Sequence, residues 1–311
     1  MDTLPREAWI GVVALLGLLV GSFLNVVVHR LPLEGESVAR PARSRCPACR
    51  TTLSWRENIP LVSWLVQRAR CRHCGAPIHW RYPLIEAVNA VAWGLAAYCA
   101  PEPVSIVTLV WAVALSGLVV ASAIDFERFE IPDEISIGGM VLGPLVSFLV
   151  PSLHGDPIRA LQDWTVYGWM LREGHGPHLA AATSSLLGLA MGGGVLLAIG
   201  WVGERIYGRD AMGFGDVKLL AAGGALVGPG GALAALVLAS FCASIAGLGN
   251  MARFACFLRR RCAARGRHER PGWILRVARV AGRYLPFGPY LAIGLGIVLL
   301  AWKDVERLLA P

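Results

Sequence analysis

Charged residues are scarce in this chain of 311 residues. Only 16% of them are Asp, Glu, Lys or Arg, whereas 55% are hydrophobic, and the mean hydropathy is +0.55. These values exclude an ordinary soluble domain, because several apolar runs reach the roughly 20 residues that a bilayer-spanning helix requires. The sequence therefore predicts an all-α polytopic membrane protein.

Common functional motifs are absent as well. The chain contains no GxGxxG, Walker-type loop, HExxH or GxSxG, and Gly213-x-Gly215 departs from the dinucleotide pattern because Lys218 stands at the third glycine. The N-terminal apolar run, residues 8–28, lacks the basic leading segment and the small-residue cleavage site of a signal peptide. We therefore expect this run to be retained as a membrane anchor.

The apolar runs predict the membrane topology. The expected spans are residues 8–28, 83–100, 104–124, 134–150, 179–203, 217–228, 232–251 and 285–302. Basic residues concentrate between residues 30 and 81 and between 253 and 283, and the positive-inside rule places both segments in the cytoplasm. The prediction is thus about eight transmembrane helices with both termini outside.

The net charge of +8 needs no nucleic-acid partner. Basic loops at a cytoplasmic membrane surface attract anionic lipids, which accounts for this charge. Trp55, Trp64 and Trp80 could stack on bases. However, Trp80 and Tyr82 lie just before the second span, where an interfacial aromatic belt belongs. We therefore expect anionic lipids as partners and no nucleic acid.

The predicted organisation has three parts. They are a first transmembrane helix (1–28), a cytoplasmic domain with four cysteines (29–82) and a transmembrane core (83–311) that includes an extracytoplasmic loop (151–178) and a basic cytoplasmic loop (253–283). The loop 151–178 contains His154, Asp156, His175 and His178. Their spacing is irregular, so a solvated loop is a better interpretation than a metal site.

The cysteines of the polar insert form two Cys-x-x-Cys pairs, Cys46/Cys49 and Cys71/Cys74. A segment of about fifty residues buries little core, so an additional stabilising link is expected. Two such pairs about twenty residues apart match a structural four-thiolate zinc site. Disulfides or a redox pair are the alternatives, but disulfides do not persist in the reducing cytoplasm. The sequence predicts a zinc-ribbon-like insert.

Two aspartates follow apolar helices in unusual places. Asp125 ends the third span at the negative end of the helix dipole, where a carboxylate is unfavourable. Asp216 follows Gly213 and Gly215, and it either caps the next helix or belongs to a functional site. Asp133 is interpreted mainly as the N-cap of the fourth span. Counting spans returns Asp125 and Asp216 to the same cytoplasmic face.

This arrangement suits an aspartic protease. Two close carboxylates share one proton, because ionising both is costly. The ionised carboxylate takes a proton from the attacking water, and the protonated one donates to the peptide carbonyl. Glu86, about one turn inside the second span, is expected to face the bundle or a cavity.

These residues resemble the type IV prepilin peptidases, which belong to the GxGD class of membrane aspartic proteases. The resemblance covers nearly the whole chain. It is carried by the stretch Gly21–Pro32, both cysteine pairs, Asp125 with Ile131-Pro132-Asp133, the stretch Met212–Lys218, and Pro286-Phe287-Gly288-Pro289. One departure is the insert 151–178, which lengthens the separation between the two aspartates.

The resemblance implies specific roles. Asp125 and Asp216 match the two catalytic aspartates, and the substrates would be prepilins or pseudopilins cut after a glycine on the cytoplasmic side of the bacterial inner membrane. Many members then methylate the new N-terminal amine with S-adenosylmethionine, so a bifunctional enzyme is expected. Glu86 is a tentative residue for binding that cofactor or for positioning the substrate.

Two other functions are compatible with parts of the sequence. A proton- or cation-coupled transporter could use both aspartates, although transporters place such groups near the bilayer midplane, and these lie at span ends. A membrane-tethered zinc-ribbon adaptor would leave Asp125 and the stretch Gly213–Asp216 unexplained.

Overall fold

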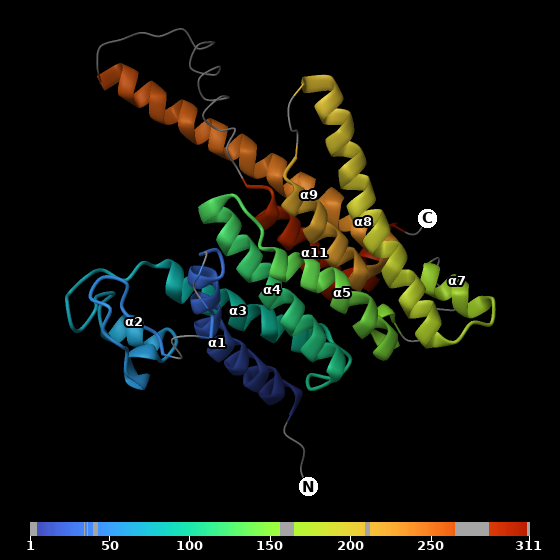
Figure 1. Ribbon diagram of the computed structural model, residues 1–311, viewed down its shortest axis with the longest axis horizontal. Helices are drawn as coiled ribbons and strands as arrows, with labels where there is room; N and C mark the ends of the chain where they lie inside the picture. Colours follow the sequence, from blue (N-terminus) through green and yellow to red (C-terminus); the bar gives the residue numbers. More distant parts are fainter. Residues whose placement is uncertain are drawn as a thin grey trace.

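The computed structural model describes residues 5–33, 35, 37–39, 43–155, 165–208, 212–264 and 286–309 (Figure 1). In these ranges the regular structure is helical apart from two isolated β-bridges, which confirms the predicted all-α class. The α-helices are α1 (Arg6–Arg30), α2 (Val62–Val66), α3 (Arg81–Cys99), α4 (Ile106–Arg128), α5 (Asp133–Leu149), α7 (Val166–Arg172), α8 (Pro177–Tyr207), α9 (Phe214–Ala264) and α11 (Gly288–Leu309). Two 3-10 helices, η1 (Trp55–Asn58) and η2 (Pro151–His154), also occur.

Four helices, α1, α4, α8 and α9, are long and apolar enough to cross a membrane, and α11 adds a shorter apolar stretch. Each predicted span overlaps a helix of the structure. The chain is a multi-pass membrane protein. The total of about eight spans stays a prediction, because α3 and α5 are not among the four helices that are long and apolar enough to cross a membrane.

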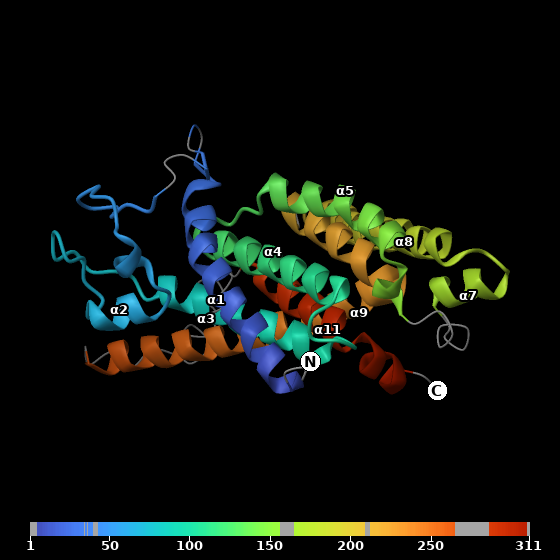
Figure 2. The same ribbon diagram turned by 90° about the horizontal axis from the view of Figure 1, so that it is seen from below.

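Helix α9 consists of two helices joined at Gly228, whose φ of 75° and ψ of 176° are not helical. The second half runs back along the first (Figures 1 and 2). The predicted break at Gly228-Pro229 is thus confirmed. Because Pro229 has no N–H, the Ala225 carbonyl loses its helical partner. The hydroxyls of Ser185 and Ser147 donate to this carbonyl at 2.5 and 3.3 Å.

Buried polar contacts join α1, α3 and α4. The Asn89 side chain is fully buried; it donates to the Gly17 carbonyl at 2.7 Å and accepts from the Ser116 hydroxyl at 2.8 Å. A Cβ at Gly17 would lie 2.5 Å from the Cβ of Trp93, so only glycine permits this approach of α1 to α3. The first helix is therefore held in a fixed register.

The segment between α5 and α8 differs from the predicted solvated loop. Tyr167 is 1% exposed, and Met170 packs with Ala180 and Ala181 at the start of α8. These side chains are buried because α7 is largely apolar and packs against the start of α8. Asp156 lies outside the described residues. Among the described residues, the histidines of this segment form no metal-binding group.

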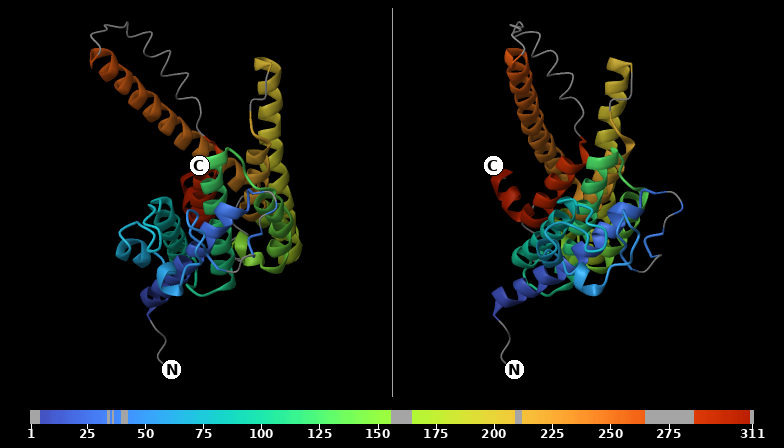
Figure 3. Two further views of the ribbon diagram at one scale, coloured as in Figure 1. Left: turned by 60° about the vertical axis from the view of Figure 1, so that its left-hand side comes forward. Right: turned by 90° about the vertical axis from the view of Figure 1, so that its left-hand side faces the viewer.

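The predicted basic loop 253–283 begins as helix. Helix α9 continues to Ala264, because residues 253–264 contain neither glycine nor proline and are rich in good helix formers. Residues 265–283 lie outside the described ranges. The second half of α9 and the end of α8 project from the bundle (Figure 3). The cysteine-containing segment and α7 lie at opposite ends of the molecule (Figures 1 and 2).

Candidate active site and metal centre

Asp125 lies in the last turn of α4 and is 5% exposed. The helix ends because Phe129 adopts a left-handed conformation, with φ 58°, and its N–H donates to the Asp125 carbonyl at 3.0 Å. Pro132 then keeps the chain extended before α5 begins. Asp125 thus precedes a sharp turn at the end of an apolar helix, as the sequence predicts.

The carboxyl group of Asp125 contacts the start of α11. The backbone N–H of Gly288, the first residue of α11, donates to Asp125 Oδ2 at 3.0 Å. The first N–H groups of a helix have no partner within it, so they bind carboxylates well. A Cβ at Gly288 would lie only 2.5 Å from the same oxygen. Glycine is therefore needed for this contact.

Asp216 is the third residue of α9. Because the helix begins at Phe214, Asp216 lies in its first turn and is not its N-cap. The Gly213 carbonyl accepts from the Asp216 N–H at 3.2 Å. A Cβ at Gly215 would lie 3.1 Å from the Cβ of Ile131, so glycine lets the chain after α4 approach α9 closely.

Asp125 and Asp216 line one cavity of about 900 Å³. The cavity is acidic, since Glu130, Asp133 and Glu134 also line it. The structure thus brings together two aspartates that the sequence placed on different helices.

Asp133 differs from its predicted role. It is the first residue of α5 and makes no capping hydrogen bond; instead its carboxylate forms an ion pair with Lys218 of α9. The ion pair links the helix after Asp125 to the helix that carries Asp216. The local sequence could not predict this ion pair, because its two residues lie on different helices.

The four predicted metal ligands come together. The Sγ atoms of Cys46, Cys49, Cys71 and Cys74 all lie within 4.8 Å of one another, and those of Cys46 and Cys74 are 3.9 Å apart. Tetrahedral Zn–S bonds of about 2.3 Å place the sulfur atoms roughly 3.8 Å apart. The cluster could therefore hold a metal ion such as zinc. His73 instead pairs with Glu57 at 3.2 Å.

Two similar turns present these sulfur atoms. Each turn is closed by an isolated bridge, Arg45 with Thr52 in the first and Arg70 with Pro77 in the second. In both turns the N–H of the first cysteine donates to the carbonyl of the residue five positions later: Cys46 to Thr51 at 3.0 Å and Cys71 to Ala76 at 2.9 Å. The spacing of each Cys-x-x-Cys pair thus fixes a local turn.

The thiols differ in acidity. Hydrogen bonds from Thr51 lower the pKa of Cys49 to about 6. A hydrogen bond with the Ala76 backbone lowers the pKa of Cys74. Desolvation and the neighbouring cysteine sulfurs outweigh this effect and raise the pKa of Cys74 to about 11. Four sulfur atoms this close do not all carry a negative charge unless a cation compensates them, which a divalent metal does.

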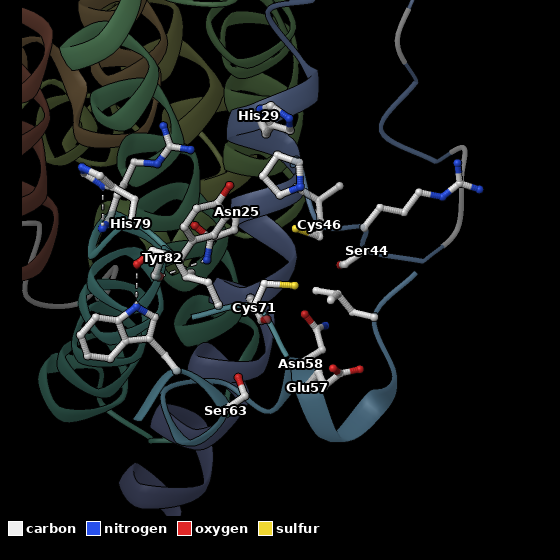
Figure 4. A pocket seen from close by; sticks show the side chains of 18 of the residues that line it. Asn25, His29, Ser44, Cys46, Glu57, Asn58, Ser63, Cys71, His79 and Tyr82 are labelled. Atoms are coloured by element: carbon white, nitrogen blue, oxygen red, sulfur yellow. Dashed lines mark hydrogen bonds between the residues drawn. The ribbon is translucent and has the colours of Figure 1, made fainter. Parts of the chain in front are cut away.

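Glu86 borders a second cavity, of about 470 Å³, between α1, α3 and the cysteine-containing segment; we call it the α1–α3 cavity. Glu86 is 8% exposed, and its Oε2 accepts from the Leu61 N–H at 2.8 Å. Asn25 and Tyr82 also line this cavity (Figure 4). The expectation that Glu86 faces a cavity is confirmed.

Sequence reasoning missed three contributors. Gly288 was part of the family resemblance but had no assigned role, Lys218 was noted only as a departure from a glycine pattern, and Asn25 was not singled out. The proline-flanked Pro286–Pro289 stretch was the available signal for Gly288, because prolines on both sides of a glycine favour a fixed helix start.

Comparisons with known proteins agree with this architecture. The family model "Bacterial Peptidase A24 N-terminal domain" matches residues 15–100, and "Type IV leader peptidase family" matches residues 112–248. The first match includes the four cysteines, and the second includes both aspartates. No solved structure matches the chain.

Several curated relatives carry the name "Prepilin leader peptidase/N-methyltransferase". The protein of Aeromonas hydrophila is 31% identical, over 95% of this chain and 91% of its own length. That of Klebsiella pneumoniae is 35% identical over 71% of this chain and 86% of its own. That of Myxococcus xanthus (strain DK1622) is 37% identical over 75% of this chain and 60% of its own.

The fold and these matches define a class of protein, the membrane-embedded leader peptidases. Within that class, the chain belongs to the type IV leader peptidase family.

Proposed function

We propose that this chain is a prepilin peptidase that cuts the leader from type IV prepilins and pseudopilins with Asp125 and Asp216 as its catalytic pair. The observation that carries this proposal is the shared cavity, which is lined by one aspartate from the end of α4 and one from the start of α9. A transporter is disfavoured, because both groups lie at helix ends and the relatives are named as peptidases.

In the proposed mechanism the two aspartates share one proton. The ionised carboxylate removes a proton from a water molecule, and the resulting hydroxide attacks the peptide carbonyl carbon. The protonated carboxyl group donates its proton to the carbonyl oxygen. In the second half the roles exchange, a proton passes to the leaving amine, and the peptide C–N bond breaks. The Gly288 amide holds the Asp125 carboxyl group in place.

The cavity fits a basic peptide leader. Glu130, Asp133 and Glu134 line it, and only Asp133 has an ion-pair partner among the described residues. A prepilin carries its basic leader just before an apolar helix, so the leader would lie at the membrane surface beside these acidic side chains. Basic loops on the same side support an orientation in which the site faces the cytoplasm of the bacterial inner membrane, near anionic lipids.

We also propose that the cysteine cluster holds a structural zinc ion. All four ligands are sulfur atoms, so no position stays open for a water molecule, and a closed site of this kind stabilises a small fold. Zinc would thus fix residues 43–78 against α1 and α3. Nothing in this role requires the metal to take part in peptide cleavage.

The second proposed activity is methylation of the new N-terminal amine, with S-adenosylmethionine as the methyl donor. Its support is the name shared by the relatives, which includes N-methyltransferase. The residues present fit such a group, since the α1–α3 cavity contains a buried amide oxygen, Asn25 Oδ1, without a hydrogen-bond partner.

Single replacement of each aspartate tests the peptidase proposal. Asp125→Asn and Asp216→Asn should each reduce leader cleavage of a purified prepilin by at least about 10³-fold, because each removes a group that transfers a proton. Cleavage is measured by the mobility of the shortened product in reconstituted membranes. Glu204→Gln, which alters an exposed carboxylate near the end of α8, is the matched control and should cleave normally. Normal cleavage by either aspartate variant would refute the pair.

A further inference from the structure

The chain between α4 and α5, residues 129–132, lines the catalytic cavity; we call it the α4–α5 segment. Residues 130–132 are neither helical nor part of a turn, and Pro132 has φ −60° and ψ 137°. A residue that precedes proline is restricted to extended conformations, so Ile131 is extended as well. The segment therefore has the backbone of a short strand.

The backbone of the α4–α5 segment keeps several polar groups unpaired. Among the described residues, the N–H groups of Glu130 and Ile131 and the carbonyls of Phe129, Glu130 and Ile131 have no hydrogen-bond partner. Backbone N–H and C=O groups are normally paired, and an unpaired strand edge binds another extended chain readily. The segment thus offers a strand edge to a peptide in the catalytic cavity.

The side chain of Ile131 fixes this edge between the two aspartates. A Cβ at Gly215 would lie 3.1 Å from the Ile131 Cβ, and a Cβ at Gly288 would lie 3.1 Å from its Cδ1. Gly215 directly precedes Asp216, and the Gly288 N–H donates to Asp125. Ile131 also packs against the buried apolar cluster that α9 and α11 share. One side chain therefore lies against the backbone beside both carboxyl groups.

The proposed substrate needs a partner of this kind. Carbonyl groups within an α-helix are engaged in hydrogen bonds, so a protease must act on an extended stretch of peptide. An exposed strand edge binds such a stretch through main-chain hydrogen bonds. A strand rises about 3.3 Å per residue, so the edge of residues 129–131 spans about three residues of a peptide. A cavity of about 900 Å³ has room for that length.

We propose that residues 129–131 pair with the substrate backbone as one strand of a two-stranded β-ladder, which presents the carbonyl of the cleaved bond to Asp125 and Asp216. This inference rests on the proposed peptidase function and deepens it, because it assigns the group that holds the peptide extended. The backbone of the segment binds the substrate, and Ile131 is a positioning residue. Because main-chain pairing does not depend on substrate side chains, the edge accepts leaders of different sequences.

Ester substitution in the substrate tests this pairing. A synthetic prepilin peptide, with the leader and the start of the apolar helix, is made with one backbone N–H at a time replaced by oxygen. The replacements cover successive residues on both sides of the cleaved bond, and the cleaved bond itself is left as an amide. The full-length protein in detergent micelles cleaves each peptide, and mass spectrometry measures the rate.

The expected result is an alternating pattern along the peptide. In a β-ladder the N–H groups of alternate residues point toward the partner strand, and those between them point away. Each ester at a pairing position removes one hydrogen bond, so kcat/KM should fall about fivefold there. Esters at the positions between should leave kcat/KM unchanged.

Ile131→Ala and Ile137→Ala are the matched variants. Ile131→Ala removes the side chain that fixes the edge, so it should lower kcat/KM for the all-amide peptide and abolish the alternation among the esters. Ile137 lies on α5 and is 45% exposed, so its replacement should change neither the rate nor the pattern. A merely structural role of Ile131 would slow the cleavage of all peptides equally and keep the alternation.

Two results would overturn the pairing, and they differ in what else they exclude. A wild-type protein that cleaves the all-amide peptide but tolerates every ester, or loses equally at neighbouring positions, would refute the strand edge and leave the peptidase proposal intact. Failure to cleave the all-amide peptide, in membranes as well as in micelles, would refute the proposed function and the pairing with it. If Ile131→Ala does not fold, the ester series with the wild-type protein decides alone.

Discussion

Replacing Gly288 with alanine should disable the peptidase without unfolding the protein. The new Cβ would lie 2.5 Å from Asp125 Oδ2 and 3.1 Å from its Cγ. An ordinary contact needs about 3.4 Å or more. The carboxyl group must therefore move by about 0.9 Å, while the backbone of residue 288 itself is not strained, because its φ is not in the left-handed region.

The expected loss follows from that displacement. A catalytic group misplaced by about 1 Å costs on the order of 10²-fold in rate, which corresponds to about 2.7 kcal/mol in the barrier. We therefore expect kcat/KM for leader cleavage to fall roughly 10²-fold in Gly288→Ala. Cleavage of a purified prepilin in reconstituted membranes measures this loss, and the melting temperature in detergent shows whether the fold is kept.

Three other glycines give a graded comparison. A Cβ at Gly215 would meet Ile131 at 3.1 Å, so Gly215→Ala should cause a smaller loss. At Gly213 the nearest atom is Asp216 Oδ2 at 3.4 Å, an ordinary contact, so little loss is expected. Gly138, with nothing within 4 Å, is the control. Equal activity of Gly288→Ala and Gly138→Ala would refute the inference that the Gly288 contact positions Asp125.

The remaining predictions concern the metal cluster and the end of the bundle that carries α7. Cys46→Ser should remove the bound zinc and lower the melting temperature, whereas Cys256→Ser, an exposed cysteine of α9, should change neither; metal analysis of the purified protein decides, and unchanged zinc in Cys46→Ser would refute the site. Burial holds the pKa of His154 at about 4, below its usual 6.5. Its neutral form is therefore favoured in the folded state, so stability is complete above about pH 6.5 and falls as the pH drops toward 4, by at most about 3 kcal/mol. Melting temperatures at pH 7.5 and 5 should differ more in wild type than in His154→Gln, and an equal difference would contradict this role.

His154 also illustrates why the segment between α5 and α8 was misjudged. Its sequence is polar and rich in histidine, which is typical of a solvated loop. In the structure the His154 Nε2 lies 3.1 Å from Ser147 Oγ, and that hydroxyl donates to the Ala225 carbonyl freed by Pro229. The contact forms because a proline on another helix leaves a carbonyl without a partner, and the sequence of the loop carries no sign of it.

The sequence by itself determined the helical class, the break at Gly228, the cysteine set and the choice of Asp125 and Asp216. Each is a local property: the length of an apolar run, a glycine or proline, a Cys-x-x-Cys turn, or a carboxylate at the end of a span. Such properties depend on neighbours along the chain, so they can be read without a tertiary structure.

Only the tertiary structure decided which groups meet. Gly288 and Asp125 are 163 residues apart in the sequence, and Lys218 and Asp133 are 85 apart. Their contacts, like the unpartnered oxygen of Asn25, depend on how closely helices approach, which glycines at particular crossings permit. Hydropathy predicts that a helix lies in the membrane, but it does not determine the neighbour or rotation, because side-chain packing between helices sets both.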